Sequence, residues 1–512
     1  MEETVMENNM LSGFNDGNAF AAQHDEGEKP EYTRSEVILS VFVMIASFCF
    51  IRYVLFHLMG FITTGLFIAI ISAAIIYMKK KKYEFSGFNK LLAAVLYIFS
   101  MVFSITANNL VKNLDAVFLI GVGAYFVYSV GASNNKIDRF LPYAMFKALL
   151  EYPFSHFGTQ GKITSDAISS SKKGSEARYI LLGLIITVPL TAIVAALLMA
   201  ADDGLERMLS GIADHIFGNG FWDIVLQLIL AIPCSMYLFG LLYANAHRNE
   251  LNKLNEQACT QKIYNMRFLS NLVVYTAVTP ICILYVLFFM SQASYFLSAF
   301  TNSLPEGFTY ADYARRGFFE LCAVAVINLI VTCFISLFSK KAGKEKPLAL
   351  KVYSVMISVF TLILIATAMS KMVMYISRYG LTALRFYTSW FMVLLAIVFV
   401  LIIVKQFRFD MKLSRDISAV FVFMFGLLCF CRPEAVIAKY NIEMYKSGSL
   451  EELDTDTLLR MSDDAVLTAY DEGVLTVEEI KEYKLDRIYL VGYGDTLKKY
   501  NLSSVILEMK MN

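Results

Sequence analysis

The stretch "TYADYARRGFFELCAVAVINLIV", Thr309 to Val331, places several charged side chains directly in front of a long apolar run. From Gly317 to Phe338 that run is almost entirely apolar, apart from Glu320 near its start and Asn328 in its middle. A helix that crosses a bilayer needs roughly 20 mostly apolar residues, because hydrocarbon offers the backbone no hydrogen-bond partner. The stretch therefore predicts a transmembrane helix with charges at its entrance.

Runs of this kind recur along the whole chain. The 512 residues are 57% hydrophobic and 17% charged, which is typical of a polytopic membrane protein and not of a soluble one. The sequence predicts an all-α membrane helix bundle with about eleven transmembrane helices, of which the third and the last are short for a full crossing. The expected spans are 37–56, 59–78, 91–106, 116–132, 179–200, 221–243, 268–290, 317–338, 353–374, 386–404 and 417–431.

Lysine and arginine are concentrated in alternate connections between the expected spans. One set of connections contains Lys79–Lys82, Lys340–Lys351 and Lys405–Arg415, whereas the opposite set is poor and includes Lys112 as an unpaired outer charge. Short cytoplasmic loops of membrane proteins carry the excess of positive charge. The pattern predicts a multi-pass protein of the bacterial plasma (inner) membrane, with its N-terminus in the cytoplasm and its C-terminus outside.

Changes in composition divide the chain into five expected parts. The first is a disordered acidic tail, and the third combines an interfacial helix with a Ser-rich linker in the cytoplasm. The last is an acidic, helical C-terminal tail on the extracytoplasmic side, where Thr476 and Glu479 have the spacing of a helix-capping box. The expected boundaries are 1–36 (tail), 37–132 (four spans), 133–178 (interfacial helix and linker), 179–431 (seven spans) and 432–512 (C-terminal tail).

A candidate polar site follows from the opening stretch. Glu320 and Asn328 are eight positions apart, which predicts that they share one stripe of their helix, facing protein or water. Cations lie near the same end of the next two spans, where Gly380 is expected to turn the chain. The cluster is interpreted either as a binding site for an anionic group or as a structural ion-pair latch. Its members are Arg315, Glu320, Asn328, Lys371, Arg378 and Arg385.

Two further patterns leave alternatives open. Pro189, Pro233 and Pro280 interrupt three spans, and broken helices line the substrate paths of many transporters, although proline is also common in spans as a plain kink. The pair Asp202 and Asp203, together with Asp223 (all of them outside the membrane in the expected topology), could serve a metal-dependent lipid-linked transferase. Loop acids, however, more often cap helices.

Motifs of classical enzymes are not found in the sequence. The histidines are scattered, and there is no phosphate-binding loop, nucleophile elbow or kinase signature. We therefore predict no catalytic residues, no cofactor, no metal site and no nucleic-acid partner, and we expect that the protein is not an enzyme.

Four motifs are spaced along the chain: "AADDGLERML", "LPEGFTYADYARRGFFELCAVAVINL", "SRYGLTALRF", and "RPEAVIAKYNIEMYKSG" followed by "LRMSDDAVLTAY". Together they resemble a family of polytopic bacterial membrane proteins known only as a domain of unknown function. The resemblance runs from about residue 90 to 470, and it implies an integral plasma-membrane protein without adding any chemistry. Matching positions are Tyr310, Tyr313, Arg315, Gly317, Glu320, Asn328, Tyr379, Gly380, Thr382 and Arg385.

These patterns favour a function in the bilayer. The first hypothesis is transport or flipping of a lipid or small anionic solute through the outward polar site, with the lipid bilayer and an anionic lipid or solute as partners. The alternative is a non-catalytic membrane sensor or envelope-assembly scaffold, and a lipid-linked transferase is the third class. A cavity beside the prolines would favour transport, and a tightly packed bundle would favour a scaffold.

Overall fold

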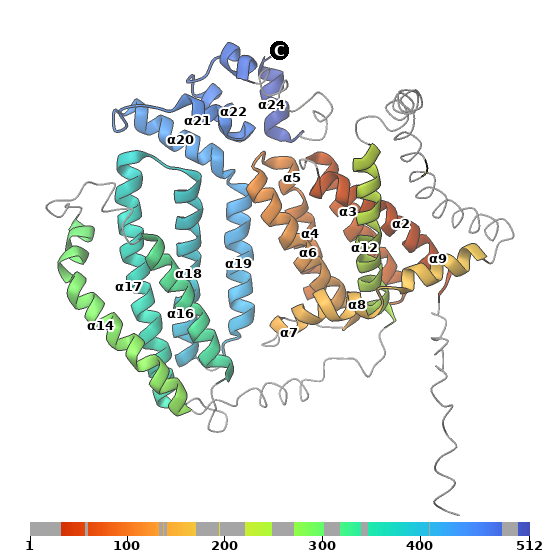
Figure 1. The fold of residues 1–512 in the computed structure, drawn as a ribbon, viewed down its shortest axis with the longest axis horizontal. Helices are drawn as coiled ribbons and strands as arrows, with labels where there is room; N and C mark the ends of the chain where they lie inside the picture. Colours follow the sequence, from red (N-terminus) through yellow and green to blue (C-terminus); the bar gives the residue numbers. More distant parts are fainter. Residues whose placement is uncertain are drawn as a thin grey trace, which may run out of the picture.

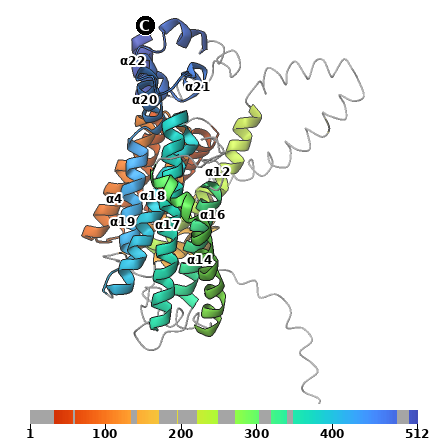
Figure 2. The ribbon, with the colours of Figure 1, turned by 90° about the vertical axis from the view of Figure 1, so that its left-hand side faces the viewer.

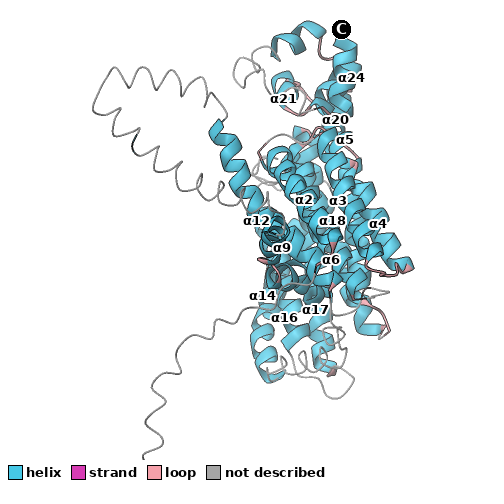
Figure 3. Cartoon of the chain, turned by 90° about the vertical axis from the view of Figure 1, so that its right-hand side faces the viewer, coloured by secondary structure: helices cyan, strands magenta, loops and turns pink. Residues whose placement is uncertain are grey.

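The computed structural model describes residues 32–56, 60–132, 137, 141–169, 194, 221–247, 271–301, 318–338, 347–408, 410–483 and 500–511. In this part of the chain every regular element is helical and there is no strand (Figure 3). Ten described helices are long and apolar enough to cross a membrane, which confirms the predicted all-α polytopic bundle. Each corresponds to one of the expected spans, and the expected span 179–200 lies outside the described residues.

The first bundle is formed by the N-terminal helices together with α12 (Figure 1). Its centre is filled by apolar and aromatic side chains, such as Phe67 stacked on Phe103 with 5.3 Å between ring centroids. Close packing of α12 (Phe221–Ala246) on the short helix α8 (Tyr152–Ser155) leaves no room for a side chain at Gly240, because a Cβ there would lie 2.3 Å from the Pro153 carbonyl oxygen. The helices are α2 (Arg34–Phe50) with η1 (Ile51–Leu55), α3 (Phe61–Lys80), α4 (Gly87–Ser100), α5 (Val102–Ile105), α6 (Asn109–Gly131) and α12 (Phe221–Ala246).

The second bundle packs around its own apolar core, and α19 lies between the two bundles (Figures 1 and 2). Phe425 of α19 stacks on Phe99 of α4 at 5.7 Å, while the indole N–H of Trp390 in α18 donates to the Met424 carbonyl oxygen at 3.0 Å. Helix α19 therefore contacts both bundles. The helices are α14 (Asn271–Thr301), α16 (Phe318–Phe338), α17 (Leu348–Tyr379), α18 (Ala383–Phe407) and α19 (Leu413–Phe430).

One end of the molecule, here called the lysine-rich end, is where α3 stops at Lys79 and Lys80. Short helices lie across it, and α9 is anchored there because Gln160 donates to the Ser40 carbonyl oxygen at 3.2 Å. Helix α9 continues to Ser169, into the stretch expected to be a Ser-rich linker. The helices are α7 (Leu141–Phe146), η2 (Lys147–Glu151), α8 (Tyr152–Ser155) and α9 (Thr159–Ser169).

The C-terminal helices form a separate small core that covers the opposite end of both bundles (Figures 1 and 2). We call residues 433–511 the cap and this end of the molecule the cap end. The tail expected to be an appendage is therefore packed against the membrane helices. Its helices are α20 (Pro433–Lys446), α21 (Thr455–Arg460), α22 (Asp463–Asp471), a turn of helix at 477–483, and α24 (Leu502–Met511).

Candidate functional site

A buried carboxylate, Asp464, joins the cap to the first bundle. One oxygen accepts hydrogen bonds from the Thr106 hydroxyl (2.5 Å) and the Ala107 backbone N–H (2.9 Å) in the loop between α5 and α6. The other oxygen accepts from Arg432 Nε (3.0 Å) and the Ser503 hydroxyl (2.5 Å). Asp464 has no exposed surface, so these four donors replace all of its hydration.

Arg432 is held in an unusual backbone conformation at the start of the cap. Its φ of +53° lies in the left-handed region, which costs a residue with a side chain roughly 1–2 kcal/mol. The guanidinium offsets this cost, because it binds both Asp464 and the Ser503 hydroxyl, the latter at 2.8 Å. Pro433 then starts α20, where a proline loses no helical hydrogen bond.

A second junction joins the cap to the turn between α17 and α18. Asn441 of α20 accepts a hydrogen bond from the Leu381 backbone N–H (2.6 Å) and donates to the Leu381 carbonyl oxygen (2.8 Å). Gly380 has a φ of +74°, and a Cβ there would lie 2.7 Å from Asn441 Oδ1. The predicted turn at Gly380 is thus present, and it is shaped to receive an amide from the cap.

The bundles also meet directly beneath the cap. Asn108 caps α6 by accepting a hydrogen bond from the Val111 N–H at 2.9 Å, and its amide nitrogen donates to the Tyr387 hydroxyl of α18 at 3.0 Å. One side chain therefore both starts a helix of the first bundle and holds a helix of the second.

Lys112 and Asp115 lie one turn apart on α6, below this junction. Lys112 was expected to be an unpaired outer charge, but it is only 2% exposed and interacts electrostatically with Asp463 and Asp464 of the cap. That expectation was wrong because α6 begins seven residues before the predicted span, and so carries both charged residues into the bundle.

The predicted stripe of Glu320 and Asn328 is divided between two faces of α16. Asn328 is 1% exposed, whereas Glu320 is exposed. Eight residues turn a helix by about 800°, which is about 80° past two full turns, so the two side chains diverge. Asn328 is used inside the second bundle, where it accepts from the Tyr285 hydroxyl (2.6 Å) and donates to the Thr361 hydroxyl (2.8 Å).

The predicted cations have separate surroundings, and Arg315 lies outside the described residues. Lys371 interacts electrostatically with Glu320, although the described ion pairs within 4.0 Å do not include these two groups. Arg378 pairs at 3.8 Å with Glu451 of the cap, and both side chains are exposed.

Arg385 belongs to the turn between α17 and α18. It donates to the carbonyl oxygens of Tyr379 (3.1 Å) and Gly380 (2.5 Å), and its guanidinium carbon lies 3.9 Å from the centre of the Tyr375 ring. These contacts fix the arginine beside the junction with Asn441. The structure thus brings Gly380 and Arg385 together. Among the described residues, Arg385 and Glu320 do not form an ion pair.

A polar cluster also closes the lysine-rich end. Glu36 near the start of α2 binds Lys81 at 2.5 Å and the Tyr77 hydroxyl at 3.1 Å, and Lys81 lies 3.2 Å from His247. In the turn after α8, burial and the nearby His247 lower the pKa of His156. These contacts join α2, α3 and α12 at their ends.

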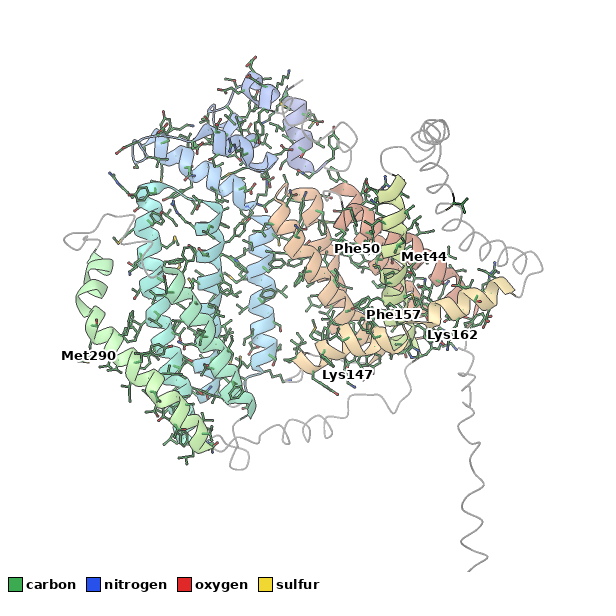
Figure 4. All side chains as sticks on the ribbon, viewed as in Figure 1. Met44, Phe50, Lys147, Phe157, Lys162 and Met290 are labelled. Atoms are coloured by element: carbon green, nitrogen blue, oxygen red, sulfur yellow. The ribbon has the colours of Figure 1, made fainter. Side chains whose placement is uncertain are left out.

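An apolar cavity of about 210 Å³ lies inside the first bundle, between α2, α3, α6 and α12. Phe50 of α2, whose position is labelled in Figure 4, is one of the lining residues. Helix α12 contributes Cys234 and Tyr237, just after Pro233. Ile120 also lines the cavity and is 39% exposed in the described part of the chain. Its chemistry suits a hydrocarbon chain.

The described residues hold no group of three or more His, Cys, Asp or Glu side chains that could bind a metal ion. Of the three aspartates considered for a transferase, Asp202 and Asp203 lie outside the described residues, and Asp223 lies in the first turn of α12. The functional candidates in the described part are therefore the cap junctions, Lys112 with Asp115, and the apolar cavity.

The chain belongs to the family described as Domain of unknown function (DUF4153), whose model matches residues 67–472. This confirms the predicted resemblance. The matched range contains Asp464, Asn441 and most of the residues that line the cavity, but not Ala46, Ser47 or Phe50 of the lining, nor Ser503 of the Asp464 junction. No curated protein and no solved structure matches the chain. Together with the ten apolar helices, the family supports an integral, multi-pass membrane protein.

Proposed function

We propose, for this member of the DUF4153 family, that the chain binds a membrane lipid by one acyl chain in the cavity of the first bundle and moves that lipid within the bilayer. The observation that carries the proposal is the apolar cavity beside Pro233. Its volume of about 210 Å³ exceeds the roughly 150 Å³ of an engineered protein cavity that binds benzene.

The lining supports one of the two substrates expected from the sequence. Apart from Ser47, Cys234 and the Tyr237 hydroxyl, the residues around the cavity are hydrocarbon or glycine. Tyr237 donates its hydroxyl to the Leu149 carbonyl oxygen at 2.9 Å. A small anion would find no cation among these residues, whereas an acyl chain would gain dispersion contacts. The geometry therefore favours a lipid.

Filling the cavity is expected to weaken lipid binding by on the order of tenfold, or about 1.4 kcal/mol. Gly123 lines the cavity, and a Cβ there meets no atom within 4 Å, so Gly123→Leu places its side chain in the empty space. About ten lost dispersion contacts of 0.1–0.2 kcal/mol each account for the effect. The measurement is photolabelling of the purified protein with a diazirine-bearing phospholipid, followed by mass spectrometry of the labelled peptides.

Gly65→Leu is the matched control. Gly65 is exposed on α3, a Cβ there also meets no atom within 4 Å, and it does not line the cavity. Equal labelling of cavity residues in both variants would contradict the proposal, as would wild-type protein whose cavity residues take up no label. The second result would be expected if another segment of the chain, such as the predicted span 179–200, occupied the cavity.

The second candidate function is a membrane-embedded scaffold or sensor that acts through the cap. It is supported by the two cap junctions, at Asp464 and Asn441, which attach one soluble element to both bundles. A partner protein that binds the cap would then change how the two bundles are positioned relative to each other. This function would be favoured by two results together: every variant keeps the lipid labelling of the wild type, and a partner protein co-purifies with the chain only when the cap is present.

Orientation in the bacterial plasma membrane is part of the same proposal. The lysine-rich end faces the cytoplasm and the cap lies outside, because positive charge marks cytoplasmic loops. A cysteine at exposed Ser449 of the cap is expected to react with an impermeant maleimide in intact cells, whereas one at exposed Glu84, between α3 and α4, is expected to react only after lysis. The parent protein with its native cysteines sets the background, and the reverse pattern would invert the topology.

A further inference from the structure

Asp115 is a carboxyl group inside a membrane span. It lies six residues after the start of α6, which is about 9 Å along the helix, and it has no exposed surface. Neither of its oxygens has a hydrogen-bond partner among the residues that the structure describes. An ionised carboxylate in this position would lose its hydration without any compensating hydrogen bond.

The titratable groups around Asp115 come from a few elements. On its own helix the nearest is Lys112, and on α19 it is Cys429, which interacts electrostatically with Asp115. Residues 96–105 of α4 and α5, which also pack on α6, contain Tyr97, whose hydroxyl bonds with Ser72 at 2.9 Å. On α18 the titratable group is Tyr387, whose hydroxyl accepts a hydrogen bond from Asn108. Cys431 lies directly after the end of α19.

Lys112 has electrostatic partners in the cap and is close in sequence to one acid of its own helix. It interacts electrostatically with Asp463 and Asp464 of the cap, and it lies three positions before Asp115, where side chains on a helix can meet. Asp464 keeps its four hydrogen-bond donors whichever way Lys112 points. The ammonium group can therefore turn from the cap to Asp115 without leaving Asp464 unpartnered.

We infer that Asp115 is a proton-binding site whose occupancy is linked to the hold of Lys112 on the cap. With a proton on Asp115, the carboxyl is neutral and Lys112 stays with Asp463 and Asp464. When the proton leaves to water at the cap end, the new carboxylate attracts Lys112, and the attraction between Lys112 and the cap acids weakens. This inference is independent of the lipid proposal. It identifies a proton as an ion that the protein binds and releases.

The test is difference infrared spectroscopy of the full chain in lipid nanodiscs, titrated with pH. At neutral pH we expect a C=O stretching band of a protonated carboxylic acid in the wild type and in Asp456→Asn, whose side chain is exposed on α21. The band should be lost in Asp115→Asn. The same band in Asp115→Asn as in the wild type would overturn the inference.

Lys112→Met tests the link to the cap and decides the question if Asp115→Asn does not fold. Without the ammonium group, the carboxylate has no cation to attract, so the proton should stay on Asp115 to a pH about one unit higher or more. If the pH at which half of the band is lost is the same in Lys112→Met and in the wild type, Lys112 does not stabilise the ionised form of Asp115. A wild-type protein without any carboxylic acid band would show that Asp115 is ionised.

Discussion

Asp464→Ala is expected to lower the free energy of unfolding by about 3–5 kcal/mol and to release the cap from the first bundle. The substitution removes the acceptor of four hydrogen bonds, leaves Arg432 without its carboxylate partner, and takes away one of the two acids that interact electrostatically with the buried Lys112. Thermal unfolding of the purified protein in detergent measures the loss. Limited proteolysis, followed at sites in residues 433–511, measures release of the cap.

Two variants bracket this result. Asp456→Ala removes an exposed carboxylate of the cap and should leave both measurements unchanged. Asp464→Asn keeps two polar atoms of the same shape and should fall between the wild type and Asp464→Ala. A cap that stays protease-resistant in Asp464→Ala, with an unchanged unfolding temperature, would show that the junction carries little of the attachment.

Gly380→Ala is expected to destabilise the protein by about 3 kcal/mol, because the backbone there has φ +74° and ψ 178°, a region that is essentially open only to glycine. The added Cβ would also lie 2.7 Å from Asn441 Oδ1, so the cap could not keep its place on the turn. Chemical or thermal unfolding of the variant in detergent measures the effect.

Gly448→Ala is the control for the contact with Asn441, because it places a side chain at a positive φ where no other atom is close. Gly448 has nearly the same φ, +73°, but a Cβ there meets no atom within 4 Å, so its substitution should cost about 1 kcal/mol. Asn441→Ala should cost less in the Gly380→Ala background than in the wild type, because the amide that is lost is already displaced. Equal losses for Gly380→Ala and Gly448→Ala would show that the contact with Asn441 is energetically neutral.

The membrane helices could be predicted from the sequence because a span is a local pattern of apolar residues. The predicted ends of the spans were less accurate where the first turns of a helix contain charged residues that are buried in the bundle. The fourth span was expected to begin at Ala116, and α6 begins at Asn109, so Lys112 and Asp115 were assigned to a loop. Their burial depends on cap residues such as Asp464, far along the chain, and no local pattern indicates that partner.

The candidate site shows the same limit. Gly380 was correctly expected to turn the chain, because its conformational freedom is a property of one residue. What the turn binds, Asn441, could not be predicted, since it is 60 positions away. A signal was nevertheless present in the sequence: "SRYGLTALRF" and "RPEAVIAKYNIEMYKSG" are two of the motifs that carry the family resemblance, and they meet in the structure at Leu381 and Asn441.

The Thr106–Asp464 hydrogen bond joins residues 358 positions apart, and this distance sets an order of events during synthesis. All ten described membrane-spanning helices precede the cap in the chain, so the loop at Thr106 and the ammonium group of Lys112 wait for partners that emerge last. Contacts of such long range form late and slowly in folding. A chain cut short before residue 464 would therefore keep its membrane helices and expose the unfilled junction, which is a surface that cellular proteases and chaperones can distinguish from the finished protein.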